Sequence, residues 1–118
     1  MKITSNFLKD TYITLCKVHP FNKWDMPPAE LVKFIVNNDN EALGTYCYTE
    51  EDEYPHVITI SRNRLSFYLT CVATLAHEMI HCSRWKDPNE GWSKHDTKFR
   101  KRAKMVATEF GSFDPLEL

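Results

Sequence analysis

The residues whose chemistry is clearest lie at positions 77–81, where His77, Glu78 and His81 form an H-E-x-x-H motif. Four residues of α-helix advance by about 400°, so the two imidazoles stand one turn apart and about 40° round from each other. Both rings can therefore reach one ion from the same face of a helix. A catalytic zinc site takes three protein ligands and leaves a fourth position for water. The motif predicts one zinc ion per chain, held by these two histidines and a third ligand.

Glu78 lies about 100° round the helix from His77, which is too far for an obvious metal ligand. It is well placed to accept a proton from water activated by the metal, the role of a general base in a metallopeptidase. The alternative interpretation is a pair of buried histidines satisfied by their neighbours, with Glu78 at a solvated edge. A buried carboxylate without a partner is costly, so that alternative is the weaker one.

The third ligand must come from further along the chain, where four residues are candidates: Glu90, His95, Asp96 and Glu109. His95 is favoured because it follows a loop long enough to turn the chain back, and because imidazole matches the first two ligands. Glu90 and Asp96 remain the alternatives.

The other histidines and the cysteines are assigned no chemistry. His19 and His56 stand beside prolines and are predicted to lie at the surface. Cys82 follows His81, but on a helix it points about 100° away, so we do not expect it to bind the metal. The cysteines form no C-x-x-C pair and are predicted to be free thiols: Cys16, Cys47, Cys71 and Cys82.

The elements that must position these residues follow from the spacing of apolar residues. Helical spacing is found in residues 3–18, in residues 65–82, and in a last segment that Ser93 could cap and Gly111 would end. Strand character is found in residues 31–36, 43–49 and 56–60. Residues 31–36 are ambiguous, and their β-branched side chains and the following Asn-rich turn favour a strand. The prediction is an α+β domain with an N-terminal helix, a small three-stranded sheet and two further helices.

Size and composition are compatible with one domain over residues 1–118. Apolar residues make up 42% of the chain and charged residues 26%, as in ordinary globular proteins. No stretch is long and apolar enough for a membrane span, and the N-terminal residues lack the apolar core of a signal peptide. We therefore expect an intracellular, cytoplasmic protein.

A basic cluster lies between positions 98 and 104, and its members are Lys98, Arg100, Lys101, Arg102 and Lys104. On the last helix these side chains would flank the apolar stripe, either as a solvated face or as a surface for DNA phosphates. Trp85 and Trp92, between the metal ligands, could stack on bases, line a substrate cleft or belong to the core.

The sequence resembles the SprT-like zinc metallopeptidase family over roughly residues 43–110. The matching segments are Ile58 to Ser61, Thr74 to His81, and Gly91 to Phe99. The resemblance implies a zincin-like fold and assigns the family's functional positions to His77, His81 and His95 as metal ligands, Glu78 as the catalytic residue and Phe99 as an aromatic core residue.

Two features depart from that family. Asp96 stands where family members often have glycine, and it could orient His95. No cysteine pair follows Cys82, so the C-terminal zinc ribbon of many members is missing. What remains looks like a minimal catalytic core of the kind that phages and bacteria encode. The resemblance implies protein substrates, among them proteins attached to DNA.

Two hypotheses follow from these patterns. The first is a zinc endopeptidase in which Glu78 assists the attack of water on a peptide bond. The second is a zinc-stabilised, nucleic-acid-associated binding module without proteolytic activity. Glu78 favours the first, because a structural zinc site needs a fourth protein ligand and no general base.

Overall fold

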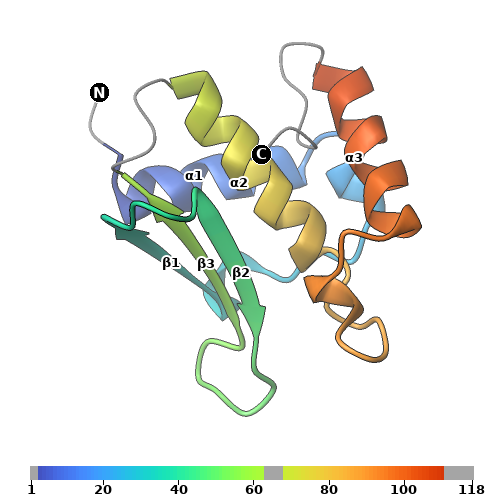
Figure 1. The fold of residues 1–118 in the computed structure, drawn as a ribbon, viewed down its shortest axis with the longest axis horizontal. Coiled ribbons are helices and arrows are strands. Elements are labelled where there is room, and N and C mark those ends of the chain that lie inside the picture. Colours follow the sequence, from blue (N-terminus) through green and yellow to red (C-terminus); the bar gives the residue numbers. More distant parts are fainter. Residues whose placement is uncertain (1–2, 63–67, 111–118) are drawn as a thin grey trace.

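The computed structural model describes residues 3–62 and 68–110 (Figure 1). Within that part of the chain the regular elements are α1 (Ser5–Cys16), β1 (Val32–Asn37), β2 (Gly44–Tyr48), β3 (His56–Ser61), α2 (Tyr68–Cys82) and α3 (Thr97–Phe110). Short 3-10 turns occupy Phe21–Lys23, Ala29–Leu31 and Gly91–Ser93. The predicted α+β class and the order helix, three strands, helix, helix are confirmed. The expected start of the second helix at residue 65 and the expected stop at Gly111 lie outside the described residues.

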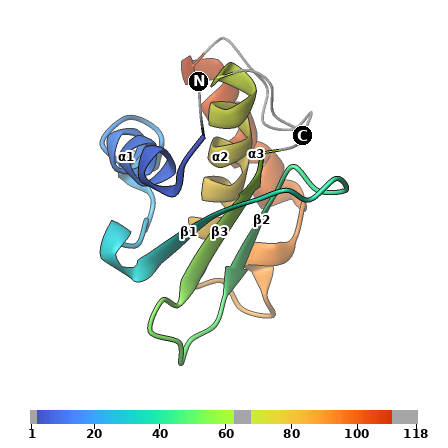
Figure 2. The ribbon, with the colours of Figure 1, turned by 90° about the vertical axis from the view of Figure 1, so that its left-hand side faces the viewer.

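The sheet has the order β1-β3-β2, with β1 parallel to β3 and β2 antiparallel to β3. The last strand therefore inserts between the first two, and β2 forms one edge of the sheet. Buried and less buried residues alternate along β1 and β3, which indicates that one face of the sheet is covered. Helix α1 contacts β1, and α2 contacts β2 and β3 (Figures 1 and 2).

Helix α2 is the central element of the domain. All of its residues from Ala73 to Cys82 are buried, as its nearly continuous apolar surface predicts. Gly44 allows β2 to approach this helix, because a Cβ at that position would lie 2.9 Å from Cγ2 of Thr74 and 3.1 Å from Cδ1 of Ile60. Thr74 is one turn before His77, so this contact brings the edge strand close to the H-E-x-x-H motif. Among the described residues, no helix is long and apolar enough to cross a membrane.

The last helix begins later than predicted. Ser93 does not cap it, because Ser93 lies in the 3-10 turn and its hydroxyl donates to the carbonyl oxygen of Glu90 at 2.8 Å. Lys94 is extended and interrupts the chain before α3. Asp96 caps the helix instead, accepting a hydrogen bond from the amide of Phe99 at 3.1 Å. The predicted apolar stripe is confirmed by the burial of Phe99, Ala103 and Val106.

The prediction that His56 lies at the surface is wrong. Its side chain is only 2% exposed, because position 56 begins β3 on the covered face of the sheet. The hydroxyl of Tyr46 is 2.7 Å from Nδ1 of His56, and burial lowers the pKa of this histidine to about 4. Pro55 before it correctly indicated a turn, but the turn is followed at once by a buried strand residue.

Candidate metal centre

Three histidines converge on one point beside the C-terminal half of α2. His77 and His81 project from successive turns of that helix, and His95 comes from the segment that precedes α3. Nε2 of His95 lies 3.0 Å from Nε2 of His81 and 3.3 Å from Nε2 of His77. Among the residues that the structure describes, this is the one group of three or more histidine, cysteine or acidic side chains whose ligand atoms lie within 4.8 Å of one another.

These distances fit a shared metal ion. Three nitrogens bound at 2.0–2.1 Å to a tetrahedral ion stand about 3.3 Å apart. Nδ1 of His81 lies 2.7 Å from the carbonyl oxygen of Trp92, which can only accept, so Nδ1 carries the proton. In a neutral ring this leaves Nε2 as the atom with the free electron pair, and that is the atom that faces the other two histidines.

The surroundings keep His81 in the neutral form that binds metals. Burial lowers its pKa to about 4, and the neighbouring rings of His77 and His95 lower it further. Phe99 lies against all three imidazoles, with ring centroids 5.1 Å from His77, 4.5 Å from His81 and 4.8 Å from His95. The aromatic core position that the family resemblance assigned to Phe99 is therefore occupied by a ring that packs the centre from α3.

Glu78 lies beside the three histidines rather than among them. Its side chain is 5% exposed, and burial raises its pKa to about 8. In the metal-free protein the carboxyl group therefore holds its proton at neutral pH. A cation at the histidines would favour the ionised form, because opposite charges stabilise each other at short range.

Two hollows open beside the centre, with volumes of about 220 and 320 Å³. Both are lined by Gly44, His77, Glu78 and His95. The smaller hollow continues along β2 to Tyr46, and the larger one continues in the other direction to Glu41. The histidines and Glu78 thus face open space on two sides of the edge strand.

The alternative third ligands do not reach this group. Glu90 is exposed and stands outside it. Both oxygens of Asp96 bind Arg84, at 2.6 and 3.0 Å, and this bond holds the pKa of Asp96 at about 2. Asp96 therefore acts on the chain next to His95 rather than on the imidazole. Cys82 is buried away from the cluster and, as predicted, it is one of four free cysteines.

The basic cluster of α3 is divided by its contacts. Lys98 binds both oxygens of Asp87 at 3.0 Å. Arg102 donates to Oγ of Ser83 at 2.7 Å and lies over a tryptophan ring. The remaining members, Arg100, Lys101 and Lys104, are exposed. Part of the predicted phosphate surface therefore holds the fold together.

The two tryptophans between the ligands occupy different places. Trp85 packs beside Tyr48 and His56 and donates from Nε1 to the carbonyl oxygen of Asp25 at 3.0 Å. Trp92 packs edge-on against Tyr46 and lines the smaller hollow. Trp85 thus belongs to the packing of the sheet, whereas Trp92 contributes to the wall of the candidate site.

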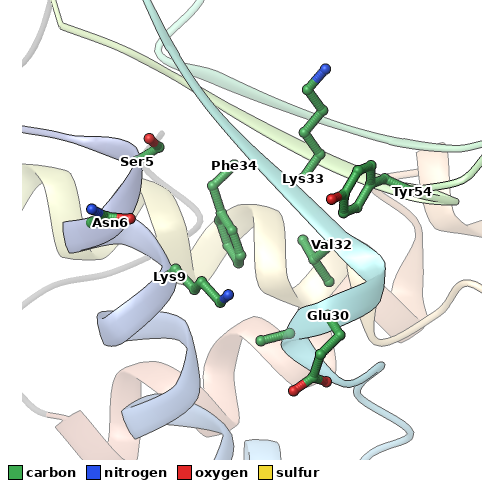
Figure 3. Close-up of a pocket in the computed structure, with 9 residues that line it drawn as sticks. Ser5, Asn6, Lys9, Glu30, Val32, Lys33, Phe34 and Tyr54 are labelled. Atoms are coloured by element: carbon green, nitrogen blue, oxygen red, sulfur yellow. The ribbon is translucent and has the colours of Figure 1, made fainter.

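A separate hollow of about 410 Å³ lies between α1 and β1 (Figure 3). Its charged lining residues are Lys9, Glu30 and Lys33, which carry both signs and do not form a metal-binding group. It adjoins the edge of the sheet opposite to β2. The candidate chemistry is therefore confined to the histidine side of the described structure.

Sequence reasoning missed Arg84, which is buried and binds Asp87 and Asp96 on either side of the 3-10 turn. Its position three residues after His81 carried no signal in a single sequence. No family model, no curated protein and no solved structure matches this chain. The function must therefore be argued from the chemistry of the site.

Proposed function

We propose that this chain is a zinc-dependent endopeptidase, with His77, His81 and His95 as metal ligands and Glu78 as the general base. The observation that carries the proposal is the convergence of three Nε2 atoms, 3.0 and 3.3 Å from one another, beside a buried carboxyl group. The resemblance to SprT-like metallopeptidases supports the same roles for the same residues.

Each residue has a distinct task. Zinc bound by the histidines would polarise a peptide carbonyl and lower the pKa of a bound water to about 7. The carbonyl oxygen of Trp92 keeps His81 in the tautomer that presents Nε2. Glu78 accepts the proton of the attacking water and returns it to the leaving amine. Its buried position suits it to hold that proton between the two steps.

An extended protein chain is the substrate that the surroundings favour. The two hollows adjoin successive stretches of chain, residues 41–44 and 44–46, with the histidines and Glu78 between them. A substrate could therefore continue past the reacting bond in both directions, as an endopeptidase requires. An exopeptidase would need a group that binds a chain end, and no charged group closes the described part of the smaller hollow beyond Glu78 and the histidines.

A structural zinc site is the weaker alternative. Such a site is closed by four protein ligands, whereas the group formed by the described residues has three. The exposed Arg100, Lys101 and Lys104 support a separate proposal, contact with DNA phosphates, which is compatible with either function.

Digestion of mixed unfolded proteins by the zinc-loaded chain tests the proposal. We expect internal cleavage that is abolished by a chelator and restored by zinc, and the reaction should be run with and without single-stranded DNA. A chain that binds zinc with high affinity but cleaves no protein under either condition would favour the binding-module alternative.

A further inference from the structure

Arg84 is a buried cation at the end of α2, only 4% exposed, and it binds on both sides of His95. Nη1 and Nη2 donate to the two carboxylate oxygens of Asp96 at 2.6 and 3.0 Å. Nη1 also lies 3.3 Å from the carbonyl oxygen of Lys94. Lys94 and Asp96 are the immediate neighbours of His95, so one guanidinium holds the chain before and after the third histidine.

His95 depends on such an anchor because no regular element holds it. It lies between the 3-10 turn Gly91–Ser93 and the start of α3, and its side chain is exposed. Its ring contacts are with Phe99 and with the other two histidines. Ordering the backbone of a residue costs about 1–2 kcal/mol, so a free segment would oppose metal binding by that amount per residue.

The loop is shaped around the guanidinium. Nε of Arg84 donates to Asp87 at 2.9 Å, which fixes the start of the loop as well as its end. A Cβ on Gly91 would lie 2.7 Å from Cβ of Asp87 and 3.2 Å from Nη2 of Arg84, so only glycine fits there. Asp96 in turn caps α3 through Phe99, whose ring packs against all three imidazoles.

We propose that Arg84 is the positioning residue of the metal centre, holding Lys94 and Asp96 so that Nε2 of His95 is already in place before the metal binds. A planar guanidinium can bind both carboxylate oxygens and a carbonyl at once, which an ammonium group cannot do. The inference rests on the proposed metal centre but not on peptidase activity.

The test compares zinc affinity with the stability of the metal-free protein. Arg84→Lys keeps the charge and loses the fork, and we expect zinc affinity, measured by competition with a chromophoric chelator, to fall about 10- to 100-fold. Arg102→Lys is the matched control, because Arg102 also joins α3 to the end of α2 but touches neither neighbour of His95. It should lower the free energy of unfolding while leaving zinc affinity within about threefold of the parent.

Cobalt(II) absorption gives a second readout, since its visible bands report the number of bound nitrogens. The Arg84→Lys protein should show an altered spectrum, and the Arg102→Lys protein should show the parent's. If Arg84→Lys does not fold, Asp96→Asn replaces it, because asparagine preserves the helix cap and weakens the bond to Arg84. Parental zinc affinity and cobalt spectrum in the folded variant would overturn the inference and leave Arg84 a purely structural residue. A parent that binds no zinc would overturn the metal centre as well, whereas a parent that binds zinc without cleaving protein would leave the test of Arg84 intact.

Discussion

Replacement of Glu78 by glutamine separates catalysis from metal binding. The side chain is buried and its pKa is raised to about 8, so in the metal-free protein it is already neutral at pH 7. Glutamine resembles that neutral form in size and shape, and we expect the free energy of unfolding to change by less than about 1 kcal/mol. Hydrolysis should fall about 100- to 10,000-fold, the usual worth of a general base, which corresponds to about 3–5 kcal/mol in the barrier.

Three measurements on Glu78→Gln are needed together: zinc content, the free energy of unfolding in urea, and the rate of peptide cleavage. Glu109→Gln is the matched control, because it makes the same exchange on an exposed residue of α3. The reasoning is refuted if Glu78→Gln cleaves at the parent's rate, whatever its zinc content. Loss of zinc from the variant would instead make Glu78 a ligand.

Three further predictions concern the metal, the pH and DNA. His95→Ala should lose most of the zinc of the parent, by elemental analysis, and His19→Ala should lose none; full occupancy in His95→Ala would refute the third ligand. Because burial lowers the pKa of His56 from 6.5 to about 4, the unfolded chain takes up its proton first as pH falls through that window. The parent should lose about 2 kcal/mol of stability between these pH values, and His56→Gln should lose less in urea titrations; equal losses would contradict this account. If Lys101 and Lys104 contact phosphates, changing each to glutamine should lower the salt dependence of DNA binding by about 0.7–0.9 per contact, and an unchanged slope would return them to a solvated face.

The local part of the site could be predicted because helix geometry converts sequence spacing directly into position. His77 and His81 are four residues apart, so their common face follows as soon as the segment is helical. His95 was favoured on ligand chemistry alone, and its arrival depends on a loop whose path no periodicity encodes. The sequence offered Ser93 and Asp96 as caps of similar quality, and the extended conformation of Lys94 decides between them.

The sheet shows where single-sequence reasoning ends. Each strand was recognised from its own residues, but the insertion of β3 between β1 and β2 depends on pairing among all three. The same pairing buries His56, which its proline neighbour had placed at the surface. Arg84 was missed for a related reason, since a buried arginine is recognisable only once its acceptors are brought together from Asp87 and Asp96.

The closeness of the three histidines along the chain has a consequence for the order of folding. His95 is separated from His81 by 14 positions and from His77 by 18, so the loop that must close is short. Closing a loop costs entropy that grows only with the logarithm of its length, and short loops close within microseconds. We expect zinc to bind a native-like unit of α2, the loop and α3 before the sheet is complete. Refolding followed by stopped-flow fluorescence should then be faster with zinc than without it, and an unchanged folding rate would show that the ion joins a chain already folded.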